Sequence, residues 1–135
     1  MKLPYAQHIT FIAVNDLDKS SHFYGQIVGL PLALDQGTCR IFKICQDSYL
    51  GICQCSEAWR PSPDGIIITW VTEDVDQRYE ELVGKNVHFE KPPSHNEAFK
   101  IYHCFFRDPD GYLLEIQRFE DPAWTAQILG PDVQM

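Results

Sequence analysis

Hydrophobic residues recur at helical spacing in two segments of the chain. In residues 15–29, apolar side chains such as Leu17 and Tyr24 recur at intervals that fit helical turns. The same spacing occurs in residues 73–84. This spacing is typical of amphipathic helices, and both segments end on a glycine, a common helix end. Both also open with acidic or amide side chains, which can accept hydrogen bonds from the free N–H groups of a first turn. The pattern therefore predicts two helices.

Short runs rich in β-branched and aromatic residues surround the two helices and predict strands. The sequence Asp108-Pro109-Asp110-Gly111 is a strong turn signal between the last two runs. Residues 56–64 include two prolines and indicate a linker between halves. The expected strands are His8–Val14, residues 39–45, residues 49–55, residues 66–72, Val87–Glu90, Ile101–Arg107 and Tyr112–Phe119.

The two halves share one order of elements, which indicates an internal duplication. Residues 15–18 match residues 73–76 at an offset of 58 (74 minus 16), and residues 49–50 match residues 112–113 at an offset of 63 (112 minus 49). Each half is too small to bury a sheet alone, whereas two together can form one core. We therefore expect an α+β protein with one domain over residues 1–120, built from modules at about 5–56 and 65–119. Residues 121–135 form a tail that we expect to be disordered beyond about Gln127.

Charge and composition narrow the classes of partner. The net charge is −8, and the basic residues are dispersed, which argues against a nucleic-acid partner. The chain has no apolar run of about 20 residues and its first residues lack a secretory pattern, so we expect no membrane association and a cytoplasmic location. The five cysteines include no C-x-x-C pair. In that location they are expected to be reduced thiols.

Four motifs follow one another along the two halves: His8–Thr10, residues 15–30, residues 72–76 and the hairpin of residues 106–116. In this order and spacing, they resemble the vicinal-oxygen-chelate superfamily, the group that contains glyoxalase I and the bleomycin- and fosfomycin-resistance proteins. The resemblance covers roughly residues 5–119 and implies two βαβββ modules that form one curled mixed sheet around an open cup. Many relatives bind one divalent metal ion there, and a dimer is common. The hairpin of residues 106–116 is the most specific of the four motifs.

The resemblance also implies a metal site, which this sequence completes only in part. His8 matches the histidine of the first strand and Glu115 matches the glutamate of the last strand, a pair suited to Mn, Fe, Ni or Zn. The second histidine is replaced by Ile66 or, with a shift of one residue, Ile67. The further glutamate of glyoxalase I would fall on Ile52 (115 minus 63), so glyoxalase I activity is not expected.

The strands supply further candidates for contact with a substrate. Aromatic side chains with a few polar groups are typical of a small-molecule pocket. A core or hydrogen-bonding role is the simpler interpretation of His103, and a turn-adjacent surface role is the simpler interpretation of Arg107. The candidate substrate-binding residues are Phe11, Cys53, Trp70, His103, Phe105 and Arg107.

Three functions remain open at this point. The first is a metal-free module that binds a small molecule in the cup. The second is a metal-dependent lyase, isomerase or dioxygenase that uses His8 and Glu115. The third is an interaction subunit without a ligand. In each case we expect a homodimer, and Trp124 in the tail is expected to dock on a neighbour or on its own domain.

Overall fold

The computed structural model describes residues 2–129, which form two compact units. The first unit comprises the chain up to Ile66 together with Arg107–Leu113, and the second comprises Ile67–Phe106 and the chain from Leu114 onward. Among the described residues, no helix has both the length and the apolar character needed to cross a bilayer.

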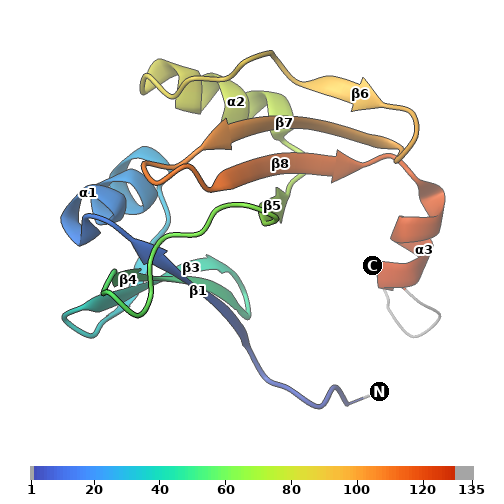
Figure 1. The fold of residues 1–135 in the computed structure, drawn as a ribbon. Helices are drawn as coiled ribbons and strands as arrows, with labels where there is room; N and C mark the ends of the chain where they lie inside the picture. Colours follow the sequence, from blue (N-terminus) through green and yellow to red (C-terminus); the bar gives the residue numbers. More distant parts are fainter. Residues whose placement is uncertain (1, 130–135) are drawn as a thin grey trace. The chain divides into compact units, whose positions relative to one another are not determined.

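The first unit contains a four-stranded mixed sheet in the order β1-β4-β3-β2. Strand β1 pairs in parallel with β4, whereas β3 pairs antiparallel with both β4 and β2. A helical segment connects β1 to β2 (Figure 1). The elements are β1 (His8–Val14), α1 (Leu17–His22), the π-helix η1 (Phe23–Ile27), β2 (Leu32–Asp35), β3 (Cys39–Cys45) and β4 (Ser48–Gln54).

The second unit repeats this plan with a sheet in the order β5-β8-β7-β6. Helix α2 lies beside this sheet and α3 follows β8 (Figure 1). Trp124 of α3 stacks on Phe119 at 4.3 Å between ring centroids, so this side chain docks on its own unit. The elements are β5 (Ile67–Val71), α2 (Val75–Gly84), β6 (Ser94–Asn96), β7 (Ile101–Arg107), β8 (Leu113–Phe119) and α3 (Pro122–Leu129).

The α+β class and the duplicated module are confirmed, and three details differ from the prediction. Residues 87–90 form no strand, and the second module instead takes its edge strand from residues 94–96, where no strand was predicted. Strand β2 was not expected. Helix α3 occupies residues 122–129 of the predicted tail, and residues 130–135 lie outside the described part of the chain.

Contacts with α1 and η1 show which residues lie on each face of the first sheet. Arg40 Nη1 donates to Ser21 Oγ at 2.7 Å. The Phe42 ring packs against Gly25 of η1, and a Cβ added to this glycine would lie 3.2 Å from the ring. Arg40 is directly opposite Ile52 on β4, and opposed residues share a face. Ile52 therefore points toward α1. The other face carries Cys53 and the neighbouring odd-numbered positions of β1 and β4.

The second sheet has the same arrangement with respect to α2. The Tyr102 hydroxyl donates to the Asp76 carboxylate of α2, and Arg118 lies over the Tyr102 ring at 4.6 Å. Even-numbered positions of β7 and β8 therefore face α2. Side chains alternate along a strand, so His103 and Glu115 lie on the opposite face.

A buried carboxylate organises the turn of residues 107–113 within the first unit. Asp108 Oδ1 accepts hydrogen bonds from the backbone N–H groups of Asp110 and Tyr112 at 2.8 Å and 3.0 Å, and Oδ2 accepts from the Tyr24 hydroxyl at 2.6 Å. Burial raises the pKa of the Asp108 carboxyl, while these hydrogen bonds oppose the shift. The Tyr112 hydroxyl donates to the Ala13 carbonyl at 3.0 Å and ties the turn to β1.

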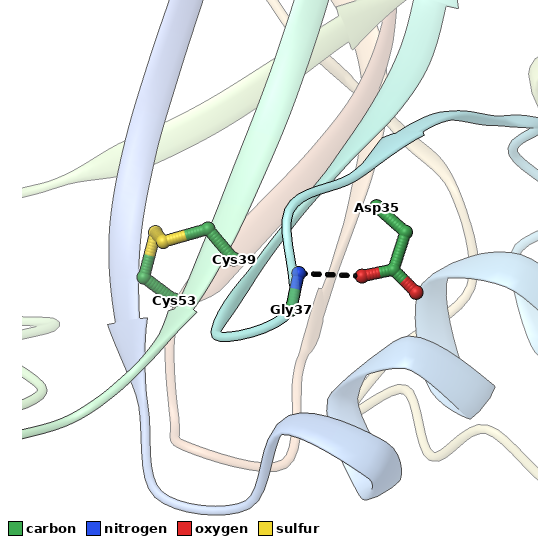
Figure 2. The surroundings of a disulfide bond; sticks show 4 residues. All are labelled: Asp35, Gly37, Cys39 and Cys53. Atoms are coloured by element: carbon green, nitrogen blue, oxygen red, sulfur yellow. Dashed lines mark hydrogen bonds between the residues drawn. A yellow bond between two sulfur atoms is a disulfide. The ribbon is translucent and has the colours of Figure 1, made fainter.

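Cys39 and Cys53 form a disulfide, which corrects the prediction of five reduced thiols (Figure 2). The two residues are directly opposite each other on β3 and β4. Only the strand register brings them together, since they are 14 residues apart in the sequence. Cys45, Cys55 and Cys104 are free cysteines.

The hydrogen bond between Tyr24 and Asp108 yields a stability prediction. Tyr24→Phe removes the donor to Asp108 Oδ2 and leaves a buried acceptor unsatisfied, which should lower the free energy of unfolding by about 1–3 kcal/mol. Urea denaturation followed by circular dichroism measures this loss. Tyr102→Phe removes a hydroxyl bound to a carboxylate at the surface and should cost much less. Equal losses in the two variants would contradict the role given to Asp108.

Candidate functional site

The candidate site lies on the face of the second sheet that points away from α2. Its centre is a pair of buried ionisable side chains on neighbouring strands, His103 of β7 and Glu115 of β8, which are 8% and 7% exposed. Strand alternation places both on this face, because their even-numbered neighbours point toward α2. The Phe105 ring packs edge-on against the His103 ring at 4.9 Å between centroids.

Three side chains compensate the buried Glu115 carboxylate. His103 Nδ1 lies 2.6 Å from Oε2, and the Thr69 hydroxyl of β5 donates to Oε1 at 2.7 Å. Gln117 lies two positions further along β8, on the same face. When its amide is oriented with the nitrogen toward the carboxylate, this nitrogen lies 3.2 Å from Glu115 Oε1 and 3.1 Å from Oε2 and can donate to both. A buried carboxylate is costly unless it is hydrogen-bonded, so this arrangement removes most of that cost.

The carboxylate also determines what the imidazole can do. With Glu115 ionised, the His103 nitrogen that faces it must carry a hydrogen and donate. In the neutral ring, Nε2 is then the acceptor, and in the protonated ring both nitrogens donate. The pair therefore orients an imidazole whose second nitrogen can accept a hydrogen bond or a proton from a bound molecule.

These residues do not fit the metal site that the resemblance implies. Both oxygens of Glu115 already accept hydrogen bonds from protein side chains. The two positions proposed for the second histidine hold exposed aliphatic side chains, Ile66 and Ile67. Among the described residues, no three histidine, cysteine, aspartate or glutamate side chains are grouped so that they could hold a metal ion.

His8 lies in the first unit and is exposed. Its Nε2 lies 3.2 Å from the Thr10 hydroxyl, and alternation puts both side chains on the same face of β1 as Ile12. Ile12 pairs with Ile52 of β4, which points toward α1. His8 is therefore on the opposite face of the strand from Phe11. Because His8 and Glu115 belong to different units, their joint action remains a prediction.

The other predicted residues fall on several surfaces. Phe11 is 43% exposed, and its ring covers Gly51 on β4, where a Cβ would clash with the ring. Cys53 shares that face but is held in the disulfide. Arg107 Nη1 donates to the Gly111 carbonyl at 2.7 Å and thereby closes the turn. Trp70 is next to Thr69 on β5, so alternation turns it toward the α2 side of the sheet.

Sequence reasoning missed two residues of the site, Thr69 and Gln117. Gln117 is two positions from Glu115, so strand alternation alone indicates that the two share a face. The match of Glu115 with Ile52 was wrong in register, since Ile52 points toward α1 whereas Glu115 points away from α2. The corresponding face of β4 carries Gly51 and Cys53, and neither residue supplies a carboxylate.

A cavity of about 660 Å³ lies elsewhere, in the first unit between the α1–η1 segment and strands β2 and β3. Its polar lining includes Ser21, His22, Asp35 and Arg40, and its apolar lining includes Leu32 and Phe42. Arg40 also forms an ion pair with Asp18 at 3.0 Å, so the positive charge in this cavity is compensated. The cavity is on the α1 side of the sheet, away from the face of Phe11 and Cys53.

The buried pair predicts that replacing one partner lowers the free energy of unfolding more than replacing both. His103→Leu leaves the Glu115 carboxylate buried without its histidine donor and should lower the free energy of unfolding by roughly 2–4 kcal/mol. The double variant His103→Leu/Glu115→Leu removes both polar groups and should be more stable than the single variant. Denaturant unfolding of both proteins measures the difference.

A second histidine–glutamate pair supplies the control. His95 Nδ1 lies 2.7 Å from Glu120 Oε1, but this pair is exposed, so His95→Leu should cost well under about 1 kcal/mol. A cost for His103→Leu as small as that for His95→Leu would show that the buried carboxylate does not depend on His103.

Comparison with known proteins agrees with this architecture. The chain is 27% identical over 119 residues to an uncharacterised protein of Bacillus subtilis (strain 168), YraH, covering 79% of this chain and 93% of that protein. The fold of this chain is similar to that of a glyoxalase/bleomycin resistance protein/dioxygenase from Nocardioides, with a TM-score of 0.72 at 18% identity. The match covers 100% of this chain and 91% of that chain. Lactoylglutathione lyase from Agrobacterium tumefaciens has a TM-score of 0.69 at 21% identity, with coverage of 86% and 95%.

The family model for the Glyoxalase/Bleomycin resistance protein/Dioxygenase superfamily matches residues 6–116, which is most of the chain. The expectation drawn from the motifs of the two halves is thus confirmed at the level of the family. This chain belongs to the Glyoxalase/Bleomycin resistance protein/Dioxygenase superfamily.

Proposed function

We propose that this protein binds a small, partly apolar molecule at the face of the second unit that carries His103 and Phe105, without a bound metal ion. The observation that carries the proposal is the state of Glu115: its carboxylate is buried and both of its oxygens accept hydrogen bonds from side chains of the same sheet. A glutamate used in this way orients the imidazole of His103 and is not free to ligate a metal ion.

The surroundings of the pair favour a ligand with an apolar body. Ile67 and Val71 flank Thr69 at alternate positions of β5, and both are 56% exposed on the face of Glu115. Phe105 and the stacked pair of Phe119 and Trp124 add aromatic surface to this unit. Exposed apolar groups around a few buried polar ones are typical of small-molecule sites. The ligand should therefore carry one polar group, positioned to reach the second nitrogen of His103.

The alternative is a metal-dependent lyase, isomerase or dioxygenase that uses His8 and Glu115. It requires that Glu115 exchange its hydrogen bonds to His103 and Thr69 for a metal ion, and each lost bond costs about 1 kcal/mol or more. It also requires ligands beyond these two residues, since sites for such ions generally use three or more protein ligands. The proposed homodimer would be one source of a further ligand.

Metal binding separates the two functions. Isothermal titration of chelator-treated protein with Mn, Fe, Ni or Zn should show no binding of one ion per chain with a dissociation constant below about 10 µM. Glu115→Gln should give the same result as the unaltered chain. Tight binding of one ion per chain that disappears in Glu115→Gln would overturn the proposal and support the metal-dependent enzyme.

The position of the ligand can be mapped even though its identity is open. A library of aromatic amides and ketones, screened by two-dimensional NMR of ¹⁵N-labelled protein, should shift the amide signals of Thr69, His103 and Gln117. Phe105→Ala should weaken these shifts, because it removes the ring beside His103. Shifts confined to the residues around Arg40 would instead place ligand binding in the cavity of the first unit and contradict the proposal.

A further inference from the structure

We propose that Cys39 and Cys53 form a reversible thiol–disulfide couple that exchanges with low-molecular-weight thiols, with attack at the sulfur of Cys39. The inference is independent of the proposed function, since both cysteines lie in the first unit. Figure 2 shows the bond between strands β3 and β4, beside the turn in which Gly37 N donates to the Asp35 carboxylate at 2.8 Å.

The surrounding sheet holds the two cysteines together whether or not the bond is present. Arg40 pairs with Ile52 and Ile41 pairs with Gly51, directly next to the disulfide. On the other side, Gln54 N donates to the Thr38 carbonyl at 2.8 Å. These backbone contacts fix the register independently of the sulfur atoms. Reduction therefore leaves both thiols opposite each other, so that the bond can form again without a search through other conformations.

Unequal exposure of the two cysteines sets the direction of attack. Cys53 is 4% exposed, whereas Cys39 is half-buried at the start of β3, directly after the turn that contains Gly37. A thiolate from solution needs access to the sulfur that it attacks. It therefore reaches the sulfur of Cys39 first, and the sulfur of Cys53 is the leaving group.

The exchange is balanced in two steps. The thiolate of a small thiol such as glutathione attacks Cys39 Sγ, the S–S bond breaks, and its electron pair passes to Cys53 Sγ, which takes a proton from solvent. A second thiolate then attacks the sulfur of the small molecule in this mixed disulfide and releases the Cys39 thiolate, which is protonated in turn. In sum, two small thiols are oxidised to their disulfide while the protein disulfide is reduced to two thiols.

Redox titration of the whole folded chain tests the couple. Protein equilibrated with mixtures of reduced and oxidised glutathione is quenched with acid, its thiols are then alkylated with N-ethylmaleimide in denaturant at neutral pH, and its peptides are identified by mass spectrometry. The Cys39–Cys53 disulfide should fall and return with the glutathione ratio, with the same end point from either direction. Circular dichroism should remain unchanged. A bond that resists excess dithiothreitol until denaturant is added, or reduction that unfolds the protein, would overturn the proposal.

Substitutions test the site of attack. With oxidised glutathione, Cys53→Ser should accumulate a mixed disulfide on Cys39, whereas Cys39→Ser should leave the buried Cys53 largely unmodified. Cys45→Ser serves as the control and should retain the Cys39–Cys53 exchange, because Cys45 is a free, exposed cysteine. Mixed disulfide on Cys53 at a level equal to that on Cys39 would refute the direction of attack.

Cys104 provides an internal control for the chemistry. Burial raises the pKa of its thiol to about 11, so at pH 8 only about one molecule in a thousand carries the thiolate. Cys104 should therefore remain unmodified by glutathione in the folded protein at pH 8. Its modification together with Cys39 would show that the reagent acts on unfolded chains.

Discussion

A buried carboxylate needs hydrogen-bond donors, and the second unit supplies them to Glu115 from its own strands. Thr69 of β5, His103 of β7 and Gln117 of β8 all lie on the face that points away from α2. These donors make the burial of a negative charge tolerable and hold the imidazole in one orientation. The chemistry of the site depends on this arrangement, because a carboxylate with both oxygens engaged serves the histidine as its hydrogen-bond partner.

The two modules share a plan but use equivalent faces differently. In the first unit, the face away from α1 carries Phe11 over Gly51 and the Cys39–Cys53 disulfide. In the second unit, the equivalent face carries a hydrogen-bonded network of polar side chains. The first unit therefore carries a covalent cross-link on this face, and the second unit carries a buried ionisable pair on the equivalent face. This asymmetry explains why the proposed ligand contact and the proposed thiol exchange reside in different units.

Much of the fold could be predicted from the sequence because its signals are local. The helical spacing of residues 73–84 and the turn at residues 108–111 depend on near neighbours, and both correspond to elements of the structure. The edge strands β2 and β6 were missed because they have only four and three residues, and the residues of β2 are all exposed. A short edge strand without a buried face leaves no alternation to detect.

The candidate site was less predictable because it depends on which face a residue occupies. A shift of one position moves a side chain to the other face of a sheet, and this is how Ile52 was matched wrongly with Glu115. Alternation alone places His8 and Phe11 on opposite faces of one strand, and Trp70 and Thr69 on opposite faces of another. The sequence therefore already indicated that these predicted site residues could not all share one face. The disulfide and the contact of Thr69 with Glu115 required strand pairing, which no local pattern specifies.

The proposed function depends on the engagement of Glu115 by His103 in place of a metal ion. The most direct test is ¹⁵N NMR of the imidazole nitrogens of His103 in the whole chain, recorded before and after addition of one equivalent of Zn²⁺. We predict that Nδ1 carries a hydrogen bonded to the Glu115 carboxylate and that neither nitrogen signal changes with zinc. A ring with Nδ1 unprotonated, or signals that shift at one equivalent of zinc, would contradict the proposed role of Glu115.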